Sequence, residues 1–135
     1  MNLFKKSPAE LPAFLSTLWI FLLFNMVFAD IFSFMYPGYM AEIVSGAPID
    51  GLVITPAFLL IAAMVTEVAI LMVFLSKSLN PEVNRLANII AAVITILFVI
   101  GGGSLTLHYV FFAAIEVITS ILIISLVWKK SSLQV

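Results

Sequence analysis

The sequence contains no cysteine, a single histidine and very few charged residues, with six Lys and Arg and seven Asp and Glu among 135 residues. Without cysteine the chain can form no disulfide, no thiol redox pair and no thiolate metal site. One histidine excludes a haem held by two histidines. Because the net charge is only -1, there is no basic surface for nucleic acid, and we expect no nucleic-acid partner.

Apolar residues dominate what remains. They make up 64% of the chain against 10% charged residues, and the mean hydropathy is +1.26. A soluble domain averages about 45–50% apolar and about 25% charged residues, and it needs polar side chains to cover its core. The composition therefore predicts an integral membrane protein whose main surroundings are the lipid bilayer.

Four apolar stretches each approach the roughly 20 residues that a membrane-spanning helix needs. They cover residues 14–36, 55–76, 81–100 and 107–128. We therefore expect an all-α, up-down four-helix bundle that forms a single membrane domain over residues 1–135. Its one long connection is the outer loop, residues 37–54, in which residues 39–44 are expected to form an interfacial turn.

Proline and polar residues mark the expected helix starts. Thr55-Pro56 and Asn80-Pro81 each predict an N-cap followed by proline at the first helical position. Ser7-Pro8-Ala9-Glu10 predicts a capping box, and Pro12 predicts a bend before the first span. The aromatic side chains near the span ends are expected to form interfacial belts. These are Trp19, Trp128, Tyr36, Tyr39 and Tyr109.

The basic residues indicate an orientation. Residues 37–54 and 101–108, the two connections on one side of the expected bundle, contain no Lys or Arg. All the basic residues fall on the other side: Lys5, Lys6, Lys77, Arg85, Lys129 and Lys130. Because basic residues concentrate in cytoplasmic segments, we expect a multi-pass protein of the cell membrane with both termini in the cytoplasm.

Three carboxyl groups lie within the expected spans. At about 1.5 Å of rise per residue, Asp30 is roughly 9 Å, Glu116 roughly 13 Å and Glu67 roughly 18 Å below the outer surface. An ionised carboxyl at the bilayer centre costs about 2.5–3.5 kcal/mol, so these groups should face the bundle interior. The candidate ligand-binding residues are these three acids together with neighbouring polar side chains. The full set is Asp30, Glu67, Glu116, Asn25, Asn88, Thr95 and His108.

Helical spacing tests whether these side chains share interior faces. Three stripes combine small and polar residues, which is typical of a membrane bundle interior. They are Ala63, Glu67 and Leu71; Asn84, Asn88, Ala91 and Thr95; and Ala113, Glu116, Thr119/Ser120 and Ile123. The first span fits less well, because Asn25 and Asp30 are about 140° apart around a helix and cannot aim at one point.

The acids lack basic partners at their own depth. No Lys or Arg accompanies Asp30 or Glu116, and only an extended Arg85 could approach Glu67. The carboxyls must therefore be protonated, hydrogen-bonded or neutralised by a ligand. His108 is expected at the outer rim above them, and one histidine alone makes no metal site. We expect neither a metal nor a cofactor.

Three classes of function remain open. The first is an outward-facing acidic cavity that binds or transports a proton, a cation or an amine. The second is an accessory membrane subunit in which the polar residues only fix helix packing. The third, a membrane enzyme acting on a lipid, has least support because no nucleophile or catalytic constellation is present. Four short helices enclose little space, so a transporter of this size is expected to form a homo-oligomer.

The segments Phe58–Leu75 (FLLIAAMVTEVAILMVFL) and Asn84–Ala92 (NRLANIIAA) place a glutamate mid-helix in the second span and small residues in the third. With the glutamate-containing fourth span, they resemble the small four-span proteins of the broad DoxX-like group. The segment Leu15–Asp30 (LSTLWIFLLFNMVFAD) is similar to members of unknown function within it. The resemblance implies a four-helix fold in a bacterial or archaeal membrane and implies no particular activity.

Overall fold

The computed structural model describes residues 9–49 and 51–131. Its regular elements are helices, and their order along the chain is α1 (Leu11–Met35), α2 (Tyr39–Ser45), α3 (Pro56–Ser78), α4 (Pro81–Gly101) and α5 (Leu107–Ser131). Four of them, all except α2, are long and apolar enough to cross a membrane. The all-α prediction is confirmed, and each predicted span corresponds to one of these four helices.

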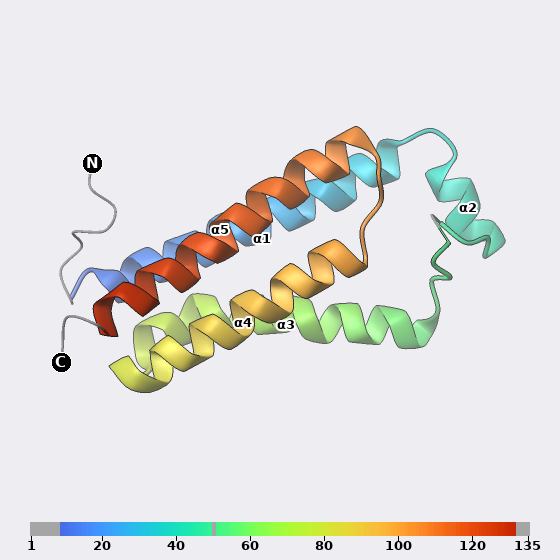
Figure 1. The fold of residues 1–135 in the computed structure, drawn as a ribbon. Helices are drawn as coiled ribbons and strands as arrows, with labels where there is room; N and C mark the ends of the chain where they lie inside the picture. The colour runs from blue at the N-terminus through green and yellow to red at the C-terminus, as the bar shows by residue number, and fades with distance from the viewer. Residues whose placement is uncertain (1–8, 50, 132–135) are drawn as a thin grey trace.

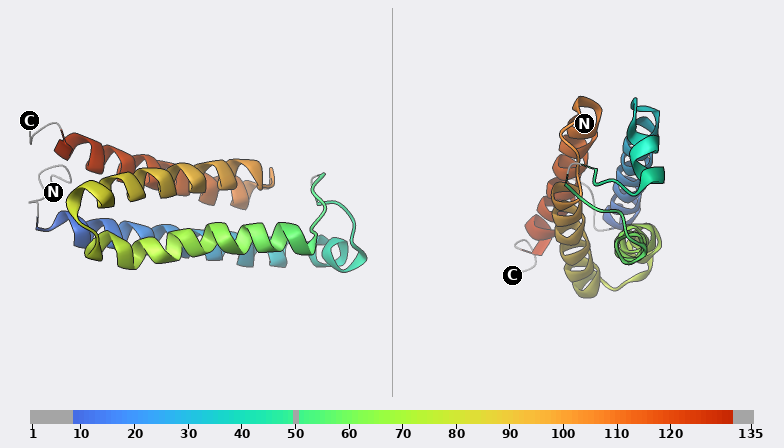
Figure 2. Two further views of the ribbon diagram at one scale, coloured as in Figure 1. Left: turned by 90° about the horizontal axis from the view of Figure 1, so that it is seen from below. Right: turned by 90° about the vertical axis from the view of Figure 1, so that its right-hand side faces the viewer.

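The four long helices pack as an antiparallel bundle (Figure 1). Helix α1 contacts α3 and α5, and α4 likewise contacts α3 and α5, so each helix touches two neighbours around a ring. The left view of Figure 2 shows α4 and α5 in one layer above α1 and α3. The start of α1, the α3–α4 turn and the end of α5 lie at one end, and we call the other end, beyond which α2 lies, the α2 end.

The helix starts agree in part with the expected caps. Thr55 Oγ1 accepts a hydrogen bond from the Phe58 amide at 3.1 Å, and Asn80 Oδ1 accepts one from the Val83 amide at 3.1 Å. Helix α1 differs, since it begins at Leu11 and includes Pro12 in its first turn. A proline there removes only an N–H that has no helical partner, so one continuous helix replaces the expected bend before the span.

Residues Ser7 and Pro8 of the predicted capping box lie outside the described residues. In the connection between α1 and α3, the expected turn over residues 39–44 is extended to the seven-residue helix α2. Glycines flank it at both ends, and Gly38 and Gly46 adopt φ values of 89° and 71°. Side chains other than glycine rarely adopt this region, so these two glycines fix where α2 begins and ends.

The core lies towards the end opposite α2, and it contains a polar network. Trp19 is fully buried, and its Nε1–H donates to Asn88 Oδ1 at 2.8 Å. Ser76 Oγ donates to the same oxygen at 3.3 Å, and Asn84 Nδ2 donates to the Ser76 carbonyl at 2.9 Å. The assignment of Trp19 to an interfacial belt is therefore wrong. Its N–H finds an acceptor inside the bundle, which removes the need to reach the membrane surface.

Helix α3 buries a different face from the one expected. Its buried residues are Ala69, Met72 and Ser76, whereas Ala63, Glu67 and Leu71 are exposed. The small residues at positions 69 and 76 allow close packing, and Ser76 bonds to the asparagines of α4. This network sets the rotation of α3, so the expected interior stripe through Glu67 is an exterior one. The stripes predicted on α4 and α5 do face the interior, with Asn88, Thr95 and Glu116 all buried.

Candidate functional site

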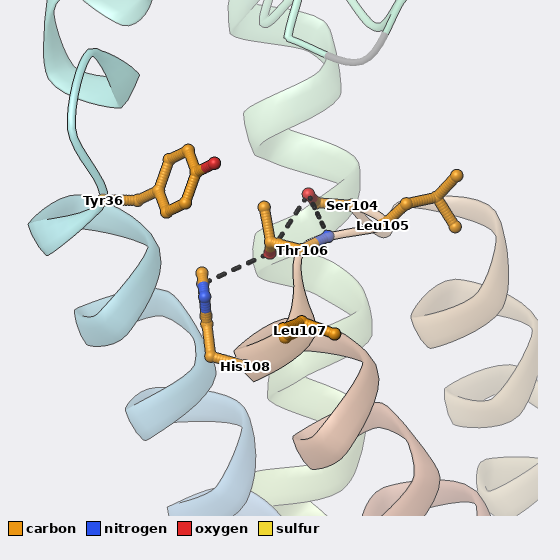
Figure 3. A pocket seen from close by; sticks show the side chains of 6 residues that line it. All are labelled: Tyr36, Ser104, Leu105, Thr106, Leu107 and His108. Carbon is orange, nitrogen blue, oxygen red and sulfur yellow. Dashed lines mark hydrogen bonds between the residues drawn. The ribbon is translucent and has the colours of Figure 1, made fainter.

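A pocket opens at the α2 end of the bundle, where the end of α1 meets the α4–α5 connection. Its volume is about 380 Å³. The lining residues are Tyr36, Ser104, Leu105, Thr106, Leu107 and His108. Figure 3 shows the Tyr36 ring and the His108 imidazole on one side and the turn with Ser104 and Thr106 on the other.

Hydrogen bonds hold the His108 imidazole that lines this pocket. His108 Nε2 is hydrogen-bonded with Ser33 Oγ at 3.2 Å and with Thr106 Oγ1 at 3.4 Å. Ser104 Oγ in turn donates to Thr106 Oγ1 and accepts from the Thr106 amide, both at 3.2 Å. The imidazole therefore links α1 to the start of α5, and the pocket has polar groups on both of its sides.

Aromatic rings continue inward from the imidazole. The rings of Phe32 and Phe112 lie 5.8 Å apart, and the Phe32 ring lies 6.4 Å from the His108 ring. On α5, His108, Phe112 and Glu116 follow each other at four-residue spacing and therefore occupy one face. The eight residues from His108 to Glu116 correspond to about 12 Å along the helix. The ring pair thus lies between the pocket at the α2 end and the buried Glu116 carboxyl.

Glu116 and Ser120 form the most unusual polar pair in the described part of the chain. Glu116 is 3% exposed and Ser120 is 0% exposed. Glu116 Oε1 and Ser120 Oγ have no hydrogen-bond partner among the described residues. Neighbouring hydroxyls behave differently, since Thr119 Oγ1 donates to the Ile115 carbonyl at 2.8 Å. An unsatisfied buried polar atom costs about 1–3 kcal/mol, so this pair marks a place where a ligand group would be stabilising.

Two of the three expected acids meet here. The carboxyls of Asp30 and Glu116 are close enough to repel each other when both are charged, although the Asp30 side chain itself is exposed. Tyr109 lies in the same neighbourhood, and its hydroxyl donates to the Val99 carbonyl at 3.0 Å. Helices α1 and α5 therefore bring Asp30 and Glu116 into one acidic region at the α2 end.

The remaining candidate residues lie elsewhere or are already engaged. Glu67 is exposed on α3. Asn88 uses both amide hydrogens on Asn84, through Nδ2 bonds of 2.8 Å to the carbonyl and 2.7 Å to Oδ1. Its own Oδ1 accepts from Trp19 and Ser76, so Asn88 has no donor left for a ligand.

Two further candidates donate to carbonyls of their own helices. Asn25 Nδ2 donates to the Phe21 carbonyl at 2.8 Å, and Thr95 Oγ1 donates to the Ala91 carbonyl at 2.9 Å. The Arg85 guanidinium, considered as a partner for Glu67, instead has its Cζ 5.8 Å from the centre of the Trp128 ring. Because it is held at that ring, it does not supply a charge to the acidic region.

Sequence reasoning missed the residues that surround His108. Ser33, Tyr36, Ser104 and Thr106 were not among the candidates, although all four contribute to the pocket or its hydrogen bonds. A usable signal was present in Ser104-Leu105-Thr106, since two hydroxyl residues directly before a helix that carries the only histidine favour a local polar turn.

Within residues 9–49 and 51–131 there is no group of three or more His, Asp or Glu side chains placed to hold a metal ion.

Comparison with known proteins identifies the family of the chain but gives no activity for it. No curated protein and no solved structure matches the chain. One family model matches over residues 1–135, and it is described as a family of unknown function, DUF6326. This match does not bear on the resemblance to the DoxX-like group. The chain belongs to the DUF6326 family.

Proposed function

We propose that this multi-pass membrane protein binds a small, singly charged guest, a metal cation or an amine, at Glu116 and Ser120. A proton is the third possible guest of the same carboxyl. The observation that carries the proposal is the pair of buried oxygens, Glu116 Oε1 and Ser120 Oγ, that have no partner among the described residues.

The two oxygens of this site, from Glu116 and Ser120, favour a guest with one positive charge. A carboxylate and a hydroxyl one helical turn apart can both accept hydrogen bonds from an ammonium group or coordinate a small cation. Asp30 adds negative potential from α1 without a fixed contact. No Lys or Arg occurs in residues 7–76 or 86–128, so the chain supplies no cation of its own at this depth.

The route to this site begins at the outer pocket. Tyr36, Thr106 and His108 provide polar and aromatic surface at the rim, and an aromatic face attracts a cation. Phe32 and Phe112 lie between the rim and Glu116 along α1 and α5, with their rings 5.8 Å apart. With both termini in the cytoplasm, as the basic residues favour, the pocket opens to the outside of the cell membrane.

Ligand-dependent stability tests the proposal. We expect at least one of sodium, potassium, ammonium or small alkylammonium chlorides to stabilise the purified protein in detergent during thermal unfolding. A guest that binds only the folded state adds about 2.7 kcal/mol at a hundredfold excess over its Kd. The effect should disappear in Glu116→Gln, weaken in Ser120→Ala and persist in Glu82→Gln, whose side chain is exposed near the start of α4.

A stabilising salt whose effect survives Glu116→Gln would contradict the site, and a screen without any stabiliser would contradict the binding function. Either result would favour the second candidate, an accessory subunit whose polar residues only fix packing. The observation that favours this alternative is the saturated network of Trp19, Ser76 and Asn88, in which polar side chains serve packing alone.

A further inference from the structure

The position of Glu67 is difficult to reconcile with an isolated chain in a bilayer. Glu67 is the central residue of the 23-residue helix α3, so it lies near the middle of a membrane-spanning segment. Its side chain is exposed and makes no hydrogen bond or ion pair with the described residues. The nearest basic residue along this helix is Lys77, ten positions and almost three turns away.

The surroundings of Glu67 form a continuous exposed stripe, which we call the Glu67 face. Its members are spaced three, four or seven residues from Glu67 and all are exposed. They are Leu60, Ala63, Met64, Glu67, Leu71 and Phe74. Residues 56–68, the half of α3 at the α2 end, contribute no buried residue to the bundle. Lipid or another protein must therefore cover the exposed side of this half-helix.

Lipid is a poor cover for a carboxyl at this depth. An ionised acid at the bilayer centre costs about 2.5–3.5 kcal/mol, and a neutral one still loses its hydrogen bonds with water. Polar side chains within membranes are therefore almost always found against protein or a water-filled cavity. The apolar residues around Glu67 exclude an aqueous cavity on this face of the single chain.

A second copy of the chain supplies a matching group. In a dimer with a twofold axis along the membrane normal, both copies of Glu67 lie at the same depth. A protonated carboxyl donates one hydrogen bond and accepts others, so two such groups satisfy each other. Ala63 precedes Glu67 by one turn, and a small residue there lets two helices approach closely.

We propose that the Glu67 face is a self-association surface, on which α3 of a second copy packs and the two Glu67 carboxyls hydrogen-bond to each other near the bilayer centre. This surface is separate from Glu116, which is buried on α5. The two proposals can therefore fail independently.

Cross-linking of single-cysteine variants tests the packing, because the chain contains no cysteine of its own. In vesicles, Ala63→Cys should form dimers with a short bismaleimide several-fold more efficiently than Ala114→Cys. Ala114 is the matched control because it is an exposed alanine seven positions from the start of α5, as Ala63 is from the start of α3. Equal yields from the two variants would overturn the surface, and so would cross-links of Ala63→Cys that occur only to a different protein in native membranes.

The role of the carboxyl is tested by energy transfer between labelled copies diluted with lipid. Interhelical hydrogen bonds in membranes contribute about 0.6–2 kcal/mol, so Glu67→Leu should raise the dimer Kd about threefold to thirtyfold. Glu67→Gln should raise it less, because an amide also donates and accepts. Because Glu67 is exposed, far-UV circular dichroism should show both variants folded. An unchanged Kd in folded Glu67→Leu would refute the carboxyl pair.

Discussion

Buried polar side chains in this membrane protein differ in whether their hydrogen-bonding groups have partners. Asn88 uses every donor it has on other buried groups, and Trp19 and Ser76 donate to its oxygen. Glu116 and Ser120 are just as buried but leave atoms without partners among the described residues. The first arrangement holds helices α1, α3 and α4 together, whereas the second is stabilised only when something else supplies the missing hydrogen bonds.

The packing role of Asn88 leads to a prediction about stability. Asn88→Leu keeps a side chain of similar size but leaves the Trp19 N–H buried without its acceptor. We expect the free energy of unfolding to fall by about 1–3 kcal/mol, measured by sodium dodecyl sulfate titration with tryptophan fluorescence. The control is Ser125→Ala, which removes only a bond to the Ile121 carbonyl of its own helix. A change no larger than that of the control would show that the network adds little.

At the scale of helices, the sequence predicted which segments form helices and where they begin and end better than it predicted which face of each helix is buried. Long apolar runs and the Thr55 and Asn80 caps located α3 and α4 closely, because caps are local hydrogen-bonding events. The buried face of α3 could not be predicted in the same way. The expectation assumed that Glu67 points inward, but Ser76 and the α4 asparagines fix the rotation through contacts between helices.

The same limit applies to the candidate site. Glu116 was predicted to be buried because small and polar residues alternate with apolar ones along α5, and this is confirmed. The proximity of Tyr36 to Ser104 and His108 depends on how α1 and the α4–α5 connection meet. Residues from segments nearly 70 positions apart come together only when the helices pack. A local sequence pattern therefore does not predict this contact.

The glycines between α4 and α5 give a prediction at this scale. A Cβ at Gly103 would overlap the Tyr109 ring, whereas one at Gly101 would meet nothing within 4 Å. We expect Gly103→Ala to lower the free energy of unfolding by about 1–3 kcal/mol through overpacking. Gly101→Ala, at the end of α4, should be neutral or slightly stabilising. Thermal unfolding of the two variants measures the difference, and equal stabilities would mean that Tyr109 moves away without cost.

For the molecule as a whole, packing is uneven along the bundle axis. The fully buried Trp19, Leu15 and Ile123 and the asparagine network lie towards the end opposite α2. At the α2 end, α3 has no fully buried residue before Ala69, and the pocket opens beside His108. Figure 1 shows the α1–α5 pair and the α3–α4 pair farther apart there. The end opposite α2 thus provides stability, whereas the groups proposed to bind a guest and a second copy lie between the middle of the bundle and the α2 end.

The direction in which these two ends face the membrane is the last prediction. Lys77 and Arg85 flank the α3–α4 turn and Lys129 lies at the same end, whereas the described residues of the α2 end carry no Lys or Arg. Because basic residues stay on the cytoplasmic side, the α2 end should face outward. Ser45, in α2, and Ser78, at the end of α3, are both exposed and can each be replaced by cysteine with little change in size. In intact cells a membrane-impermeant maleimide should label Ser45→Cys, and it should label Ser78→Cys only after the membrane is opened. The reverse labelling pattern would show that the predicted membrane orientation is wrong and that the pocket beside His108 faces the cytoplasm.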